Sequence, residues 1–263
     1  MIITNINIRL KDGSSLLMET QELISDGNAI DLFESDSDTL DSKPGLFESL
    51  MEHIESSDLV IMRISGDTFL FKRYQEFIEK VESTDTSMLM VYTTPDRSVP
   101  YRYLFKGTDD EYDLLMAYAN LGGYRNNLNI LRWALNRFDG CSFELDEPYR
   151  PPAQGVYYPG RESTDIDQYI SELDRDRPCI GILMGQRKWN SGTLEPVDAL
   201  IREIESMGGS VLPIFMIYAE NKATGSIGIR GIVDNHLLDA DGKPVIDFLI
   251  NTISSSIDRK SVV

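Results

Sequence analysis

Short apolar runs alternate with stretches of helical spacing along the first part of the chain. The runs that predict strands, from their length and β-branched residues, are "MIITNINI", "AIDLF", "DLVIMRI" and "SMLMVYTT". Three helices are predicted between these strands. In the first, Leu16, Leu17, Leu23 and Ile24 can share one face; the second covers residues 46–54, just after Pro44; the third is "FKRYQEFIEKV". Strands alternating with helices in this order predict a parallel sheet covered by helices.

The same alternation returns more clearly after Pro178. "CIGILM" and "SVLPIFMIY" predict buried strands, and the helix between them, "LEPVDALIREIESMG", carries its apolar residues on one side and ends at Gly208. A further helix face, formed by Ile229, Ile232, Val233 and Leu237, leads through the turn "DADGK" to a third strand, "PVIDFLIN". This βαβαβ order is half of a doubly wound sheet. Because so little sequence follows Asn251, we expect this unit to be incomplete and the chain to be one piece of a longer protein.

The stretch between these two regions, "PYRPPAQGVYYPG", is too rich in proline and glycine for a regular element, and "DIDQYISEL" predicts a short bridging helix. We therefore expect an N-terminal α/β domain at residues 1–145, a connector with the bridging helix at 146–176, and the first βαβαβ part of a second α/β domain at 177–263. The predicted fold class is α/β, doubly wound with mostly parallel sheets, in two Rossmann-like or flavodoxin-like units.

Two adjacent glycines in "YANLGGYRNNLNILRWAL" raise the question of a phosphate-binding loop. Such a loop needs a strand that feeds glycines opening into a helix, whereas helical spacing precedes Gly122 here. We instead predict a helix–Gly-Gly–helix corner, in which a left-handed Gly122 or Gly123 closes the first helix and Asn126 or Asn127 caps the second. The apolar face of the second helix would carry Leu128, Leu131 and Leu135.

Composition narrows the function classes. A hydrophobic content of 41% in 263 residues is enough for a sizeable core, and no run of about 18 apolar residues or secretory signal is visible, so we expect a cytoplasmic protein without a membrane span. The net charge of −18 opposes nucleic-acid binding. Cys141 and Cys179 lack companion ligands and are expected to be buried thiols.

Several separated stretches resemble one family in the same order along the chain. They are "DLVIMRISGD", "YANLGGYRNNLNILRWAL", "PYRPPAQGVYYPG", "RPCIGILMGQRKWNSGTLEPVDALIREIESMGGSVLPIFMIYAE" and "DGKPVIDFLINTIS". The family is the large subunit of cobaltochelatase and magnesium chelatase, known as the CobN or H-subunit family. The resemblance covers most of residues 58–254, so the chain is similar to the N-terminal portion of such a subunit.

The resemblance implies a function. Members of this family are very large proteins that bind a tetrapyrrole or corrin ring and insert a divalent metal, Co²⁺ or Mg²⁺, which is a substrate. Separate AAA+ ATPase subunits hydrolyse ATP for this ligase reaction. The resemblance favours cobaltochelatase, which acts in cobalamin biosynthesis, with catalytic residues beyond position 263 and no cofactor in this segment. Two alternatives stay open: a stand-alone, non-catalytic tetrapyrrole-binding or scaffold protein, and a family member that removes metal from the ring or degrades it.

Candidate site residues lie where predicted strands end, because doubly wound sheets bind ligands beyond the carboxyl ends of their strands. We expect Arg187, Lys188 and Trp189 to meet a macrocycle, since a flat aromatic ring and two cations suit its face and its carboxylates. The alternative is an ordinary exposed loop whose tryptophan packs on a neighbour. Many family members carry Arg-Ser-His in this loop, whereas this chain has Gln186, Arg187 and Lys188, which leaves the identity of the metal open.

Other chemistry-bearing residues are expected to be structural. His53 and His236 both flank predicted helix faces, and no cluster of histidine, cysteine and carboxylate has the spacing of metal ligands, so no metal site is predicted. Arg63 lies inside an apolar strand and is expected to be an ion-pair partner.

Overall fold

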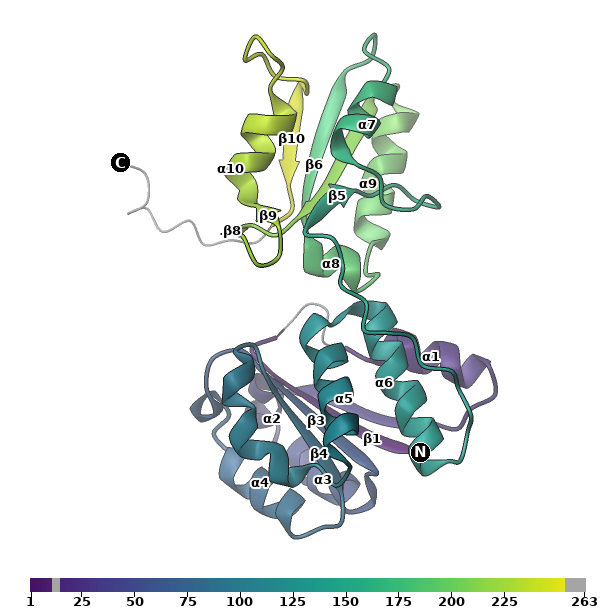
Figure 1. Cartoon of the computed structure of the whole chain (residues 1–263), viewed down its shortest axis with the longest axis vertical. Helices are drawn as coiled ribbons and strands as arrows, with labels where there is room; N and C mark the ends of the chain where they lie inside the picture. The colour runs from purple at the N-terminus through teal and green to yellow at the C-terminus, as the bar shows by residue number, and fades with distance from the viewer. Residues whose placement is uncertain (11–14, 254–263) are drawn as a thin grey trace. The chain divides into compact units, whose positions relative to one another are not determined.

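The computed structural model describes residues 1–10 and 15–253 and divides the chain into two compact units, Met1–Arg150 and Pro151–Val263 (Figure 1). The chain passes from unit 1 to unit 2 inside the segment predicted as a connector. The last residues of the domain predicted at 177–263 lie outside the described part. Among the described residues, no helix combines the length and apolar character needed to cross a membrane.

Unit 1 is built on sheet A, whose strands are all parallel and follow the order β2-β1-β3-β4. The parallel sheet predicted from the alternating pattern is therefore confirmed. The strands are β1 (Ile2–Ile8), β2 (Asp31–Asp36), β3 (Leu59–Ile64) and β4 (Ser87–Tyr92). β1, β3 and β4 are almost entirely buried, as helices on both faces require.

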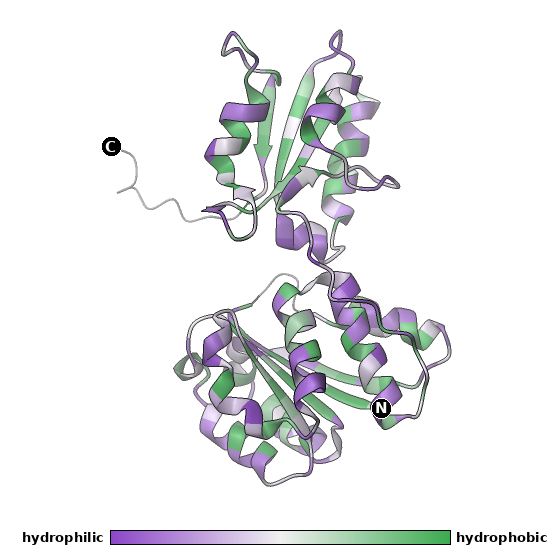
Figure 2. Cartoon of the chain, viewed as in Figure 1, coloured by the Kyte–Doolittle hydropathy of each residue, from purple (hydrophilic) through white to green (hydrophobic). Residues whose placement is uncertain are grey.

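Helices cover both faces of sheet A, and successive residues of each strand pack into opposite layers. Ile61 of β3 joins the layer of α1 (Leu17–Ser25), α5 (Asp109–Leu121) and α6 (Gly123–Phe138). Met62 joins the layer of α2 (Ser37–Ser42), α3 (Pro44–Ser56) and α4 (Tyr74–Glu82). Three 3₁₀ turns, η1 (Thr68–Leu70), η2 (Pro95–Arg97) and η3 (Val99–Leu104), complete the described elements of the unit. Figure 2 shows the strands as largely hydrophobic and the helices as mixed.

The face predicted for the first helix is only half right. Leu16 and Leu23 are fully buried against sheet A, but Leu17 and Ile24 are exposed. Residues one apart on a helix point about 100° away from each other, so a short helix lying on a sheet can bury one of two neighbouring leucines. The apolar pair at each end of the segment therefore contributes one core residue and one surface residue.

The glycine corner is present, but its details differ from the prediction. α5 ends at Leu121. The next residue, Gly122, has a φ of 60° and a ψ of −169°, which lie in a region that essentially only glycine adopts and not in the left-handed helical region. α6 begins immediately, with Gly123 at a φ of 80°. The proposed capping role of Asn126 or Asn127 is wrong, because both lie inside α6 and are buried.

Asparagines of α6 instead hold the segment that follows the helix. We call residues 139–150 the strap; it has no regular secondary structure. Asn126 Nδ2 donates to the Tyr149 carbonyl at 2.8 Å and its Oδ1 accepts from the Tyr149 amide at 2.9 Å. Asn136 makes the same pair of bonds with Phe143 at 2.8 and 2.6 Å, and Asn129 Oδ1 accepts from the Asp146 amide at 3.0 Å. These asparagines therefore satisfy backbone groups that a strand partner would otherwise satisfy.

Unit 2 is built on sheet B, with the strand order β10-β6-β7-β5. Its strands are β5 (Gln154–Val156), β6 (Cys179–Gly185), β7 (Ser210–Met216) and β10 (Phe248–Asn251). β6 pairs in parallel with both β7 and β10, which confirms the three parallel strands predicted between residues 178 and 251. β5 pairs antiparallel with β7, so the prediction of no regular element at residues 148–160 is wrong for these three residues.

Helices also cover both faces of sheet B. One layer holds α7 (Ile166–Glu172), α10 (Gly228–Ile232) and the π-helical turn η4 (Val233–Leu237). The other holds α8 (Gln186–Asn190) and α9 (Glu195–Ser206), while a small hairpin pairs β8 (Glu220–Asn221) with β9 (Ser226–Ile227). α7 packs Ile166 and Tyr169 into the core of unit 2, so it belongs to this unit.

Candidate functional site

The carboxyl ends of β6 and β7 lie side by side in sheet B, since Gly185 is paired with Met216. The residues that follow β6 were predicted as a loop, but they form the short helix α8. Its last turn is closed by bonds from the Ser191 amide to the Arg187 carbonyl at 2.9 Å and from Gly192 to Trp189 at 3.2 Å. Gly192 then takes a φ of 76°, which ends the helix.

α8 brings the three predicted site residues together. Arg187 is exposed, Lys188 and Trp189 are partly buried, and the neighbouring Gln186 anchors the helix by donating to the Pro152 carbonyl at 3.2 Å. The indole of Trp189 stacks on the buried ring of Phe215 in β7, with centroids 3.9 Å apart and planes 4° from parallel. One face of Trp189 is therefore covered by the protein itself, and a ligand ring can stack only on the other.

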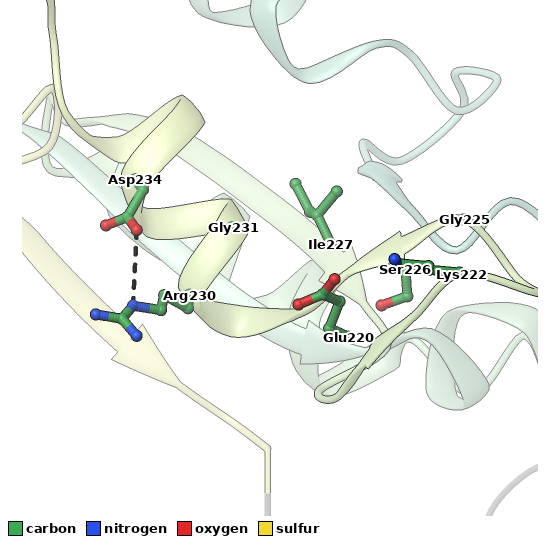
Figure 3. Close-up of a pocket in the computed structure, with 8 residues that line it drawn as sticks. All are labelled: Glu220, Lys222, Gly225, Ser226, Ile227, Arg230, Gly231 and Asp234. Carbon is green, nitrogen blue, oxygen red and sulfur yellow. Dashed lines mark ion pairs between the residues drawn. The ribbon is translucent and has the colours of Figure 1, made fainter.

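A pocket of about 470 Å³ lies beside the hairpin that follows β7 (Figure 3). Figure 3 shows Arg230 of α10 and Asp234 of η4 facing each other, at an N–O distance of 3.8 Å, with Glu220 and Lys222 on the hairpin. Gly225, Ser226, Ile227 and Gly231 complete the lining. Lys222 and Arg230 thus add two cations to the segments that leave the carboxyl end of β7. Lys222 could have been predicted as a site residue, because it follows the carboxyl end of a predicted strand. Arg230 could not, because it lies beyond a hairpin that the periodicity of the sequence does not reveal.

The histidines make structural contacts. His53 Nδ1 lies 2.9 Å from Thr4 Oγ1 and 3.2 Å from Ser57 Oγ, and His236 Nδ1 lies 2.7 Å from Asp167 Oδ1. Within residues 1–10 and 15–253, no group of three or more histidine, cysteine or acidic side chains could hold a metal ion. Cys179 is buried, and burial raises its pKa, whereas Cys141 is only partly buried, so the prediction of two buried thiols is right for one of them.

In unit 1, the carboxyl ends of β3 and β4 are tied together by Arg97. Its guanidinium donates to the Gly66 carbonyl at 2.6 Å and to Asp67 Oδ2 at 2.9 Å, and it lies 4.6 Å from the centre of the Tyr92 ring. The hydrogen bond from Arg97 also lowers the pKa of Asp67 below its usual value. These contacts occupy Asp67 and the Gly66 carbonyl, which follow β3.

Arg63 is buried at the carboxyl end of β3, on the side of sheet A that faces α6. Its Nη2 donates to Asn127 Oδ1 at 2.8 Å, and Asn127 Nδ2 donates to Glu19 Oε1 at 3.1 Å. Burial raises the pKa of Glu19 to about 7 and lowers the pKa of Arg63 to about 10, although the charges of the two groups partly oppose both shifts. Arg63 was predicted as an ion-pair partner, and the structure places an asparagine between it and the nearby carboxylate.

Known proteins resemble this chain in both sequence and fold. The fold defines the class, an α/β protein of mostly parallel, helix-covered sheets. The catalytic subunit of cobaltochelatase from Mycobacterium tuberculosis has a similar fold, with a TM-score of 0.55 and 15% sequence identity. The match covers 85% of this chain and 17% of that one. Residues 116–262 match the family described as CobN/Magnesium Chelatase. The chain belongs to the CobN/magnesium chelatase family, as its ordered sequence motifs indicated.

Two curated relatives are much longer than this chain. An uncharacterized protein of Methanocaldococcus jannaschii is 29% identical over 211 residues, which is 78% of this chain and 17% of the relative. The aerobic cobaltochelatase subunit CobN of Sinorhizobium sp. is 25% identical over 168 residues, which is 60% of this chain and 13% of that subunit. The chain therefore spans less than a fifth of the length of either relative.

Proposed function

We propose that this chain is the N-terminal portion of the large, tetrapyrrole- or corrin-binding subunit of an ATP-dependent metal chelatase, with cobaltochelatase of cobalamin biosynthesis as the specific activity. Membership of the CobN/magnesium chelatase family is the observation that carries the proposal. Similarity to an aerobic cobaltochelatase subunit favours Co²⁺ over Mg²⁺ as the metal substrate. In this proposal, AAA+ ATPase subunits are the partners that use ATP, and the cytoplasm is the compartment.

The carboxyl edge of sheet B is the part of the chain that we propose to contact the ring. Arg187 and Lys188 on α8 can pair with the carboxylates of a tetrapyrrole or corrin, and Lys222 and Arg230 supply cations at the neighbouring strand end. Trp189 can offer only the indole face that is turned away from Phe215. A ring stack of about 0.5–1.5 kcal/mol and exposed ion pairs of about 0.2–1 kcal/mol each make a weak contact, so the remainder of the subunit must complete the site.

Ring titrations of the chain in a Trp133→Phe background test this site. Trp189 is then the sole indole, because the chain has two tryptophans, and its fluorescence reports on α8. The ligands are a porphyrin that carries several carboxylates and its neutral methyl ester. We expect the acid to bind more tightly, and Arg187→Ala/Lys188→Ala to weaken it about 2- to 30-fold, from two exposed ion pairs.

The matched control is Arg175→Ala/Arg177→Ala, which removes the same charge just before β6, at the opposite edge of sheet B. Equal weakening by the two double variants would show that only net charge matters and would exclude α8 as the contact. Binding of the neutral ester as tightly as the acid would remove the role of the α8 cations in ring binding.

We expect no metal insertion by this chain alone, because it corresponds to 17% and 13% of its two relatives. The assay is the change in absorption as Co²⁺ enters a corrin or Mg²⁺ enters a porphyrin, with ATP present. Insertion by the purified chain without other subunits would mean that the catalytic groups lie within it, contrary to the proposal.

A further inference from the structure

A second pocket, of about 540 Å³, lies in unit 1 and is independent of the proposed ring contact in unit 2. It is formed where β1 and β2 end, which is the edge at which parallel sheets bind ligands. Asn7 of β1 and three residues that follow this strand, Arg9, Leu10 and Ser15, contribute to its wall. The end of β2 and the start of α2 contribute Glu34, Ser35, Asp36, Ser37, Asp38 and Thr39.

Sheet A becomes polar next to this pocket. Ile3 of β1 packs into the apolar layer under α1 and α6, and the next residues on the same face of the strand are Asn5 and Asn7. Asn7 is paired in register with Arg63 on one side and with Asp36 on the other. A buried polar surface of this kind needs a partner for each of its hydrogen-bonding groups.

Most of these groups have a partner. Asn5 Nδ2 and the Leu16 amide both donate to Glu34 Oε2 at 2.8 Å, and Asp36 accepts from the amide and hydroxyl of Thr39 at 2.9 and 2.8 Å. Asn7 is 6% exposed and lines the pocket, yet its Oδ1 accepts no hydrogen bond from the described residues. A buried amide oxygen without a donor is costly, so a ligand that donates to it would relieve that cost.

The charges of the lining indicate which ligand could donate. The lining includes three carboxylates, those of Glu34, Asp36 and Asp38, and one guanidinium, that of Arg9, while the charge of the buried Arg63 also interacts with that of Glu34. Hydroxyl groups and carboxylates dominate the remainder of the wall, so acceptors exceed fixed donors. The acidic groups of the described residues are not clustered as metal ligands, which favours an organic cation over a metal ion.

We propose that this pocket binds a small organic cation bearing an ammonium or guanidinium group, which donates to Asn7 Oδ1 and is neutralised by Glu34 and Asp38. A compact cation of this type has several N–H donors on one charged group and can reach an amide oxygen and carboxylates together. The site is unrelated to the ring and metal chemistry of the proposed function, so either proposal can fail without the other.

The test uses the whole chain, labelled with ¹⁵N, and follows the Asn7 side-chain amide by NMR during titration with agmatine and putrescine. The neutral comparison is 1,4-butanediol, and Mg²⁺ is titrated separately. We expect saturable binding of the cations that shifts the Asn7 amide signal. Asp38→Asn should weaken binding about tenfold, and Asn7→Leu at least as much, because each removes one charge-assisted or buried hydrogen bond.

Asp113→Asn is the matched control, since it makes the same charge change at an exposed position of α5. Asp38 is also exposed, so Asp38→Asn carries the test if Asn7→Leu does not fold. Equal affinities of Asp38→Asn and Asp113→Asn would overturn the proposal. So would butanediol binding as tightly as putrescine, displacement of agmatine by equimolar Mg²⁺, or no saturation by either organic cation at about 10 mM, where even weak specific sites begin to fill.

Discussion

Replacing Glu19 by glutamine should remove a pH dependence of stability that arises in the buried network of unit 1. Glu19 is 2% exposed, and burial raises its pKa from 4.5 to about 7. Glutamine keeps an oxygen that can accept the hydrogen bond from Asn127 Nδ2 and has no charge at any pH. Arg63 stays cationic in the wild type over this range, because its pKa is about 10.

The sign of the effect follows from the raised pKa. The folded protein binds the Glu19 proton more tightly than the unfolded chain does, so the contribution of this group to stability is complete below pH 4.5 and is lost as the pH rises through about 7. A shift from 4.5 to about 7 corresponds to about 3 kcal/mol. The free energy of unfolding of Glu19→Gln, relative to the wild type, should therefore increase by about that amount between pH 4.5 and about 8.

Urea unfolding at a series of pH values measures this difference. Trp133 is buried in the core of unit 1, so a Trp189→Phe background lets its fluorescence report on unit 1 alone. Glu22→Gln, at an exposed position of the same helix, is the control and should follow the wild type at every pH. A constant difference between Glu19→Gln and the wild type from pH 4.5 upward would refute the argument, because it would mean that Glu19 titrates alike in the folded and unfolded states.

Three further substitutions test other features. Asn126→Ala leaves the amide and carbonyl of Tyr149 without their partner, so urea unfolding followed by Trp133 should show a loss of about 1–3 kcal/mol, whereas Asn28→Ala, at the end of α1, should cost less. Gly122→Ala should cost about 1–3 kcal/mol in the same assay because of its φ of 60° and ψ of −169°, and an unchanged midpoint would show that the corner relaxes easily. Trp189→Ala should lower the melting temperature of unit 2 by removing the stack on Phe215, while Trp189→Phe retains most of it; equal melting temperatures for both would show that the stack contributes little.

The strands and the glycine corner could be predicted because they depend on local pattern. Largely apolar runs such as β3, β4 and β6 have few alternatives to a buried strand, and two glycines between helical stretches permit few structures other than a corner. α8 was missed because Gln186–Asn190 has no apolar periodicity. The contacts that hold it include the stack of Trp189 on Phe215 and the bond from Gln186 to Pro152. Such contacts join residues far apart in the sequence.

The roles of the polar side chains could not be predicted from the sequence. Asn126 and Asn127 sit next to each other, yet one holds the strap and the other links Arg63 to Glu19, because consecutive helical residues point about 100° apart into different surroundings. The pocket of unit 1 could not be predicted either, because it also depends on which residues the fold brings together. Asn7 belongs to an apolar strand pattern, and only the pairing of β1 with β2 and β3 shows that its neighbours are Asp36 and Arg63.

Amide hydrogen exchange should show an unusual pattern along the strap. The amides of Phe143, Asp146 and Tyr149 donate to asparagine side chains of α6, whereas those of Glu144 and Leu145 donate to no group in the described part of the chain. Protection should therefore recur at every third residue, unlike the alternate residues protected in an edge strand. Since all three acceptors belong to one helix, these amides should lose their protection together and only when α6 opens, although the strap has no regular structure of its own.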